Sequence, residues 1–196
     1  MDLHRLARRE LPPPPARVLE VGCGQGQLAL ALASDGYDVV AVDPKAPEGA
    51  IFRRTTIEEL EDEGQFDAVV ASLSLHHVHD LPDALDKVHT LMRPGAPFLV
   101  REFAWDIVDE PTARWDYARR GEPGGLAEWR AEHDDLHGFE ALTDALDGRF
   151  TRRSFAWTPY LSEYRPAEDH DAEEVRLIEA GEIRAVGFVY VGLAEP

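Results

Sequence analysis

The chain has 196 residues, 44% of them apolar, which is the size and apolar content of one α/β domain with its own core and argues against disorder. Its 38 acidic and 20 basic residues give a formal net charge of −18, which disfavours nucleic acid and anionic membrane surfaces as partners, because both are bound by basic faces. A single cysteine excludes an internal disulfide, and without an export signal or a run of about 18 apolar residues we expect a cytoplasmic protein that does not enter a membrane.

Strand-like and helix-like segments alternate through the first half of the chain, after a stiff proline leader at residues 12–15. Apolar, β-branched runs predict strands at 17–21, 38–42, 51–55, 66–71 and 97–103, of which the third is the weakest. Helices are predicted at 27–33, 57–61 and 81–91, the last with Asp80 as its N-cap. Alternation of this kind predicts a parallel sheet with helices on both faces.

The last third of the chain has a different pattern. Residues 109–147 are rich in Trp, Glu and Asp and are predicted to be mainly helical. Alternating residues at 150–160 predict a strand, and a short helix is predicted at 175–180. Residues 183–193 are apolar on both faces, which is typical of a strand inside a sheet. We expect the two strands to form an antiparallel pair added to the parallel sheet.

The segment 20–26 (EVGCGQG) lies between the first strand and the following helix. Its glycines permit a tight turn and a close approach of a ligand to the backbone, while the N–H groups at the start of the helix favour electron-rich ligand atoms. Asp43 ends the second strand, where an acid can accept hydrogen bonds from both hydroxyls of a ribose. These features predict a nucleoside-bearing cofactor at the carboxyl edge of the sheet. The alternative is an ordinary tight turn with a solvated Asp43.

The glycine spacing and the preceding acid indicate which nucleoside is bound. The dinucleotide signature is Gly-x-Gly-x-x-Gly, whereas Gly22, Gly24 and Gly26 occupy every second position here. Glu20 would repel a pyrophosphate and attract a cofactor that carries an ammonium and a sulfonium group. Two alternatives stay open: a nicotinamide-dependent oxidoreductase and a non-catalytic cofactor-binding or interaction protein.

Four segments carry a resemblance to a known family: VLEVGCGQG, VVAVDP, FDAVVASLSLHHV and LMRPGAPFLV. The chain resembles the class I S-adenosylmethionine-dependent methyltransferases, particularly the small-molecule branch of the quinone-biosynthesis type, over residues 17–103. The resemblance implies S-adenosylmethionine as cofactor and a Rossmann-like, doubly wound, three-layer α/β sandwich. Its seven-stranded, mostly parallel sheet would have the order 3-2-1-4-5-7-6 with strand 7 antiparallel, in a single domain over residues 1–196.

The resemblance also implies a set of cofactor-binding residues. They are Glu20, Gly22, Cys23, Gly24, Asp43, Pro44, Thr56, Ile57 and Ser72. Glu20 would contact the methionine end, Asp43 the ribose, and Ser72 would lie near the methionine group. Relatives often have an Asp bonded to the adenine amine at the position of Thr56, so we expect the backbone of Thr56 and Ile57 to replace that contact.

Methyl transfer is an in-line displacement that depends chiefly on alignment and exclusion of water. A base is needed only when the acceptor must lose a proton, and His76 and His77, just after the fourth strand, are the candidates. The alternative is that one of them packs or caps the loop. Glu102 and Trp105, at the end of the fifth strand, are expected to face the same mouth. Cys23 is not expected to be a nucleophile.

The acceptor is expected to be a small, partly apolar molecule methylated on oxygen, nitrogen or carbon, and not nucleic acid or a membrane lipid. The loop at 72–75 (SLSL) lacks the Asn/Asp-Pro-Pro-Tyr/Phe signature of amino-methylating nucleic-acid enzymes of this family. A helical insertion at about 105–147 is expected to cover the acceptor pocket. Its aromatic residues fit either core or pocket wall. Residues 133–137 (HDDLH) suggest a metal, but we predict no metal site.

Overall fold

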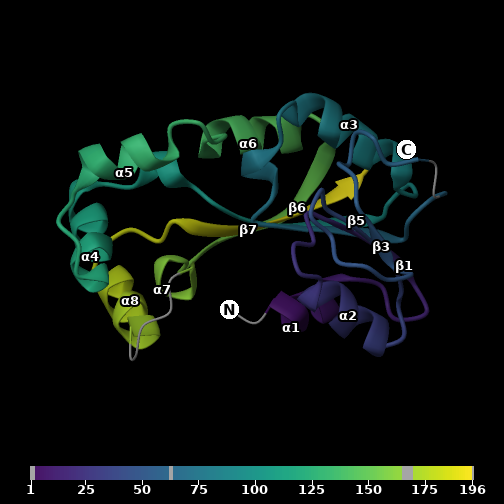
Figure 1. The fold of residues 1–196 in the computed structure, drawn as a ribbon, viewed down its shortest axis with the longest axis horizontal. Coiled ribbons are helices and arrows are strands. Elements are labelled where there is room, and N and C mark those ends of the chain that lie inside the picture. The colour runs from purple at the N-terminus through teal and green to yellow at the C-terminus, as the bar shows by residue number, and fades with distance from the viewer. Residues whose placement is uncertain (1–2, 62–63, 165–169, 196) are drawn as a thin grey trace.

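The computed structural model describes residues 3–61, 64–164 and 170–195. The described part contains one seven-stranded sheet of order β3-β2-β1-β4-β5-β7-β6, drawn in Figure 1. The strands are β1 (Arg17–Val21), β2 (Asp38–Val42), β3 (Phe52–Arg53), β4 (Ala68–Ser72), β5 (Pro97–Phe103), β6 (Phe150–Thr158) and β7 (Gly187–Ala194). β1 to β5 pair in parallel, and β7 runs antiparallel between β5 and β6. The predicted fold class and strand order are confirmed.

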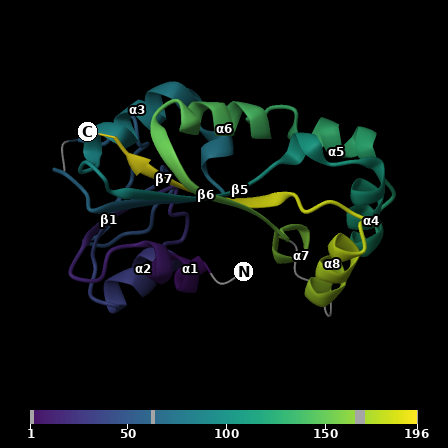
Figure 2. The same ribbon diagram turned by 180° about the vertical axis from the view of Figure 1, so that it is seen from behind.

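Helices cover both faces of this sheet. They are α1 (Leu3–Glu10), α2 (Gln27–Ser34), α3 (Leu81–Leu91), α4 (Glu110–Arg120), α5 (Leu126–His133), α6 (Phe139–Asp147), α7 (Leu161–Tyr164) and α8 (His170–Glu179), with 3-10 turns η1 (Leu75–His77) and η2 (Trp105–Ile107). Figures 1 and 2 place α1 and α2 on one face and α3 and α6 on the other. Alternate residues of the central strands therefore enter two separate apolar cores. Within the described residues no helix is long and apolar enough to cross a bilayer.

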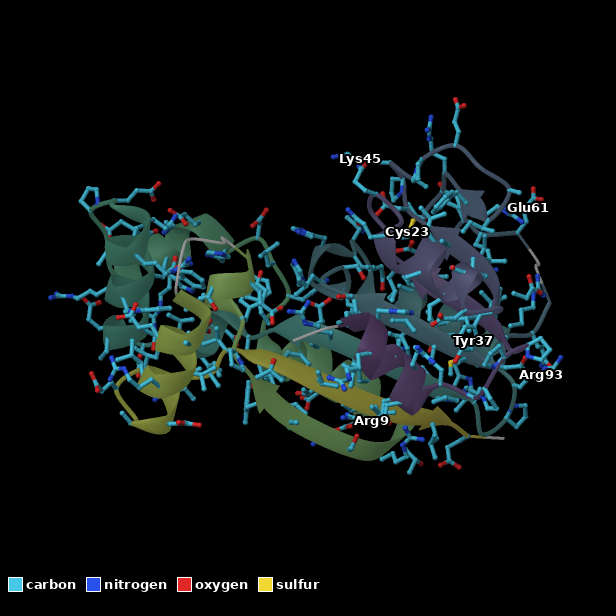
Figure 3. The ribbon with its side chains drawn as sticks, turned by 90° about the horizontal axis from the view of Figure 1, so that it is seen from below. Arg9, Cys23, Tyr37, Lys45, Glu61 and Arg93 are labelled. Atoms are coloured by element: carbon cyan, nitrogen blue, oxygen red, sulfur yellow. The ribbon has the colours of Figure 1, made fainter. Side chains whose placement is uncertain are left out.

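The remaining helices form a third apolar cluster beyond the end of the parallel sheet. We call η2, α4, α5, α7 and α8 the lateral lobe; its core contains Phe103, Val108, Ala113, Tyr117, Trp129, Tyr160, Leu161 and Val186. In Figure 1 these helices lie at the far end from β1 and α2, and the view from below in Figure 3 also places them to one side, away from Cys23. The lobe thus stands beside the parallel strands and not on top of them.

Several local elements differ from the predictions. The predicted helix at 57–61 is wrong: residues 57–59 form a turn, in which the Leu60 N–H donates to the Ile57 carbonyl at 3.3 Å. Ile57 and Leu60 are buried in the core, but a single hydrogen-bonded turn is too short to nucleate a helix. β7 begins at Gly187 instead of residue 183, because the preceding segment packs in the lobe. Helix α1 was not predicted, and it buries Leu6 and Ala7.

Candidate functional site

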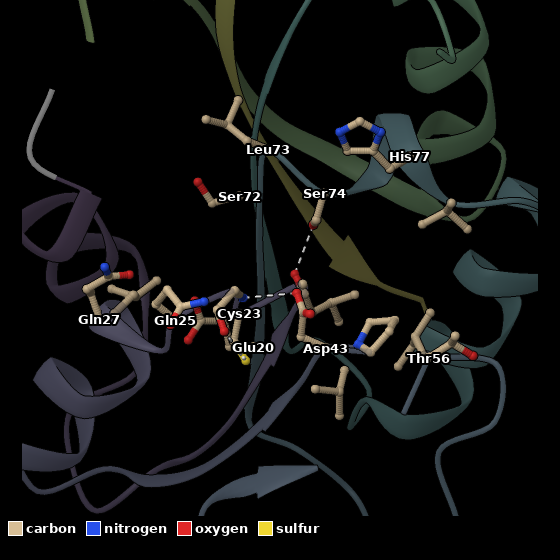
Figure 4. Close-up of a pocket in the computed structure, with 18 of the residues that line it drawn as sticks. Glu20, Cys23, Gln25, Gln27, Asp43, Thr56, Ser72, Leu73, Ser74 and His77 are labelled. Atoms are coloured by element: carbon tan, nitrogen blue, oxygen red, sulfur yellow. Dashed lines mark hydrogen bonds between the residues drawn. The ribbon is translucent and has the colours of Figure 1, made fainter. Parts of the chain in front are cut away.

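A cavity of about 820 Å³ opens at the carboxyl ends of β1, β2 and β4 (Figure 4). Its described lining residues all lie between Leu3 and His79, on α1 and α2, at the ends of β1, β2 and β4, and on the loops that follow β1, β2, β3 and β4. All nine residues predicted to bind a cofactor line it: Glu20, Gly22, Cys23, Gly24, Asp43, Pro44, Thr56, Ile57 and Ser72. The cavity has the size of a site for a cofactor-sized molecule.

The turn after β1 contains three glycines with positive φ, of 73° at Gly22, 52° at Gly24 and 78° at Gly26. A Cβ at Gly22 would overlap the side chain of Ser74, and one at Gly26 would overlap the ring of Phe52. At Gly24 no atom lies within 4 Å of an added Cβ. Gly22 and Gly26 are therefore required by packing within the protein, whereas Gly24 leaves open space that a ligand can enter.

The Asp43 carboxylate is fixed where β2 ends. Its Oδ2 accepts a hydrogen bond from the Gly24 N–H at 3.0 Å, and its Oδ1 accepts one from the Lys45 N–H at 2.7 Å. Figure 4 shows the first of these bonds closing the turn against β2. Each oxygen retains a second lone pair, so the carboxylate can also accept hydrogen bonds from two hydroxyl groups of a ligand.

Glu20 is the most unusual group in the cavity wall. Only 4% of its surface is exposed, and its Oε2 atom has no hydrogen-bond partner in the described structure. Burial raises the pKa of Glu20 from 4.5 to about 7; the Ala29 backbone opposes this shift and the Asp43 charge adds to it. A cationic ligand group beside Glu20 would supply the missing partner and favour the ionised carboxylate.

Cys23 shares this wall but has no reactive character. Burial, reinforced by the charges of Glu20 and Asp43, raises the pKa of the Cys23 thiol to about 12. The thiol therefore stays protonated at neutral pH, and the thiolate is the nucleophilic form. That Cys23 is not a nucleophile stays a prediction.

The two candidate histidines lie in different surroundings. His77 lines the cavity and in Figure 4 lies across it from Asp43, whereas His76 is 5% exposed and is not among the lining residues. The Nδ1 atom of His76 lies 2.5 Å from Oε2 of Glu102. Glu102 is fully buried, so the expectation that it faces the mouth is wrong. Of the two histidines, His77 is the one that lines the cavity in the described structure.

The predicted insertion contacts the loop after β4, which forms part of the cavity wall. His137 is its contact point: its N–H donates to the His76 carbonyl at 3.1 Å, and its Nε2 lies 2.7 Å from the Val78 carbonyl. Trp105 donates from Nε1 to the Leu136 carbonyl at 3.2 Å and belongs to the lobe. Residues 105–147 thus support a loop of the cavity and do not themselves line it in the described structure.

The aromatic and histidine residues of the insertion are mostly structural. Tyr117 and Trp129 are buried in the lobe core, and Trp115 packs against it. The Nδ1 atom of His133 lies 2.7 Å from the Trp129 carbonyl, and the two rings stack at 4.2 Å. Across the described residues no group of three or more His, Cys, Asp or Glu side chains is arranged to hold a metal ion.

Among the lining residues that the sequence analysis did not assign to the site are two on α1. Leu3 and His4 reach the cavity, and Nε2 of His4 lies 2.7 Å from an Asp35 oxygen on the segment that follows α2. The apolar spacing of Leu3, Leu6 and Leu11 was the available signal for this helix. Its position over the cavity was not readable from that spacing.

Comparison with known sequences identifies similar proteins. Residues 2–142 match the methyltransferase domain family. A ubiquinone biosynthesis O-methyltransferase of Rhodopseudomonas palustris is 31% identical over 133 residues, which is 58% of this chain and 51% of the relative. A protein with the same name from Methylocella silvestris is 30% identical over 176 residues, covering 79% and 67%. The chain thus spans between about half and two thirds of the length of these relatives.

Comparison with solved structures gives the same fold. An S-adenosylmethionine-dependent methyltransferase from Mesorhizobium loti has a TM-score of 0.65 at 16% identity, with 96% of each chain covered. The N-methyltransferase NodS from Bradyrhizobium japonicum, in complex with S-adenosyl-L-homocysteine, has a TM-score of 0.60 at 14% identity, covering all of this chain and 87% of NodS. At these identities the likeness concerns the fold alone.

Proposed function

This chain belongs to the methyltransferase domain family, and we propose that it transfers the methyl group of S-adenosylmethionine to a small, partly apolar acceptor. The observation that carries this proposal is the unpartnered, buried Oε2 of Glu20, placed in the same cavity as the fixed carboxylate of Asp43. S-adenosylmethionine has an ammonium group for the first carboxylate and two ribose hydroxyls for the second. A dinucleotide would instead bring a pyrophosphate toward these acids.

The same cavity has room for the rest of the cofactor. Gly24 leaves open space beside the turn, and we assign this space to the cofactor chain between its ribose and its amino acid end. Thr56 and Ile57 are assigned to the adenine side, and Ser72 to the methionine side. The remaining predicted residues, Cys23, Gly22 and Pro44, are assigned to apolar and backbone contacts with the cofactor. When bound, the cofactor supplies a methyl group attached to a sulfonium. The sulfur leaves as a neutral thioether, which is an excellent leaving group.

The protein's own contribution to the reaction is alignment, exclusion of water and, for a protonated acceptor, removal of a proton. His77 is the residue assigned to that last step because it lines the cavity. Burial and the neighbouring His76 lower the pKa of His77, while Glu102 and Asp135 raise it. A histidine with a lowered pKa is neutral at physiological pH and can accept a proton.

For the acceptor we propose a small molecule, methylated on oxygen, nitrogen or carbon. The formal charge of −18 opposes polyanionic partners, and similar proteins carry the name ubiquinone biosynthesis O-methyltransferase. The insertion at 105–147 is proposed to act on the acceptor side through the loop that it supports. We also propose a cytoplasmic location, with no nucleic acid or membrane as partner.

Two experiments test the proposed function. Mass spectrometry of the purified protein is expected to detect S-adenosylmethionine or S-adenosylhomocysteine; a nicotinamide dinucleotide would indicate an oxidoreductase. A screen with radiolabelled S-adenosylmethionine should then place label in pools of small metabolites. Label mainly in nucleic acid or in protein would overturn the acceptor proposal. Cofactor binding without transfer to any pool would favour a non-catalytic binding protein.

Limited proteolysis tests the role of the insertion. If residues 105–147 close on the acceptor side, S-adenosylhomocysteine together with an acceptor should slow cleavage of the α4–α5 connection near Gly121. Equal cleavage rates with and without ligands would contradict that role, while leaving the cofactor assignment intact.

A further inference from the structure

The turn that carries His77 is held by a buried carboxylate from the next strand. Glu102, on β5, is fully buried. Its Oε1 atom accepts hydrogen bonds from the Ser74 N–H at 2.8 Å and from the Leu75 N–H at 2.7 Å. Its Oε2 atom lies 2.5 Å from Nδ1 of His76. One carboxylate thus fixes both the backbone and a side chain of η1.

The same turn is held on its other side by the insertion. His137 contacts the carbonyl groups of His76 and Val78, at 3.1 Å from its backbone nitrogen and 2.7 Å from its ring. The ring of His76 lies 4.1 Å from that of His77 and 4.9 Å from that of Phe103. His77 is the only member of the 3-10 turn Leu75–His77 whose side chain is exposed, since Leu75 and His76 are both buried.

We propose that Glu102 is a positioning residue, which acts through His76 and the backbone of η1 to present His77 to the acceptor side of the cavity. The proposal rests on the proposed function, because it takes His77 as the group that meets the acceptor. Burying a carboxylate is costly unless its oxygens are hydrogen-bonded, and here all of these bonds go to the turn.

The two oxygens of Glu102 have separate roles. Oε1 organises the backbone, whereas Oε2 requires His76 to donate from Nδ1, and this selects the protonation pattern of the ring. The charged and titratable groups that face His77 are His76 on the same turn, Glu102 on β5 and Asp135 on the loop after α5. Glu102 therefore sets the place of His77 through the imidazole of His76, and it acts on the proton affinity of His77 both through His76 and directly by its charge.

The test uses Glu102→Gln with Glu174→Gln as its matched control. Glu174 is also fully buried and accepts from the backbone N–H groups of a short helix, α7, but it lies in the lateral lobe. In E102Q the amide oxygen can retain the two backbone bonds, while the amide nitrogen replaces the acceptor opposite His76. Nitrogen-15 spectra of the histidine rings should then show that Nδ1 of His76 has lost its proton and that the His77 ring signals have moved. E174Q should leave both rings unchanged.

A second variant tests the same idea if E102Q does not fold. His76→Gln keeps Glu102 and its backbone bonds but removes the ring that lowers the pKa of His77. The pKa of His77, followed by NMR titration, should rise, because the His76 ring that lowers it is gone. Unmoved His77 signals in E102Q, or an unmoved pKa in H76Q, would overturn the proposal.

Calorimetric titration with S-adenosylhomocysteine separates this inference from the proposed function. Both E102Q and H76Q are expected to bind it within about twofold of the wild type, because neither residue lines the cavity in the described structure. Failure of the wild-type protein to bind would overturn the proposed function, whereas the NMR results would still decide whether Glu102 positions His77.

Discussion

Glu20 in the cavity and Glu174 in the lateral lobe are both buried carboxylates, but their oxygens are used in different ways. Glu174 has both oxygens occupied: Oε1 accepts from the N–H groups of Tyr160 and Leu161 at 2.9 and 3.0 Å, and Oε2 accepts from the N–H of Ser162 at 2.8 Å. Glu20 has one oxygen without a partner, beside a cavity of about 820 Å³. A buried acid with all its bonds made stabilises a fold, whereas one with a bond left unmade indicates a place for a ligand.

The difference extends to the surroundings of each acid. The lobe pairs buried acids with buried bases, as in the contact of Asp116 with Arg119 at 2.7 Å and with Arg120 at 3.1 Å. At the cavity, acids from β1 and β2 face the same open space, which places two carboxylates where a cationic, hydroxyl-bearing ligand can use them. The comparison predicts opposite effects on stability when each acid is neutralised.

The largest effect is expected for Glu174→Ala. The substitution leaves three backbone N–H groups at the start of α7, those of residues 160–162, buried without an acceptor, which should lower the free energy of unfolding by about 3–5 kcal/mol. Urea unfolding monitored by circular dichroism measures this loss, and affinity for S-adenosylhomocysteine should be unchanged under conditions where the variant is folded. A loss below about 1 kcal/mol would contradict the structural role of Glu174.

Glu20→Gln is expected to raise the free energy of unfolding, but only in a defined pH range. The pKa of Glu20 is raised from 4.5 to about 7 in the folded state, so the folded protein holds a proton that the unfolded chain has lost between these values. Stability of the wild type therefore falls as pH rises from 4.5 to 7 and stays lower above 7. Neutralising the group should raise the free energy of unfolding by about 3 kcal/mol at pH 8 and leave it unchanged at pH 4.

The same Glu20→Gln variant sharpens the ligand assignment. If Glu20 receives an ammonium group, the more stable variant should bind S-adenosylmethionine more weakly, and wild-type binding near pH 6 should release a proton. Calorimetry in two buffers of different ionisation enthalpy measures that proton release. If Glu20→Gln is more stable but binds S-adenosylmethionine with unchanged affinity, the assignment of Glu20 to the cofactor site is wrong.

A smaller effect, on affinity alone, is expected at Asp43 and Gly24. Asp43→Ala should weaken binding of S-adenosylmethionine by about 1–3 kcal/mol through loss of charge-assisted hydrogen bonds to ribose. Gly24→Val should weaken it at least as much, because its side chain enters the open space beside the turn and its φ of 52° disfavours a β-branched residue. Asp109→Ala, at the N-cap of α4 in the lobe, is the control and should bind normally. Unchanged titrations for both cavity variants would reject the site.

The smallest effect is expected for Cys23→Ala. Cys23 lies in the cavity wall, but its thiol stays protonated and should contribute only apolar packing. In this respect it resembles the side chains of the lobe core. Cofactor affinity should change by about 0.5 kcal/mol or less. Wild-type protein should also react slowly with iodoacetamide at pH 8, and rapid alkylation of Cys23 would contradict the raised pKa of its thiol.

Much of the cavity was predictable from the sequence because its features are local. The glycine turn follows a strand and Asp43 ends the next one, and parallel strands bring their carboxyl ends to one edge, as the pairing of Glu20 with Ala41 in the β1–β2 register confirms. For this reason the nine predicted residues line one cavity. The alternating units predicted a parallel sheet, and the two-sided apolar pattern of residues 183–193 predicted a strand inside it, whereas the strand order was implied by the family resemblance.

Only the tertiary structure decided how roles divide among neighbouring residues. His76 and His77 are adjacent in sequence, and which one faces the cavity depends on Glu102, which lies 26 residues from His76 in the chain. The placement of residues 105–147 beside the cavity depends likewise on contacts in the lobe core, whose members are far apart in the chain. Hydrophobic periodicity specifies which face of an element is buried, but the direction of one polar side chain is set by partners that the fold brings together.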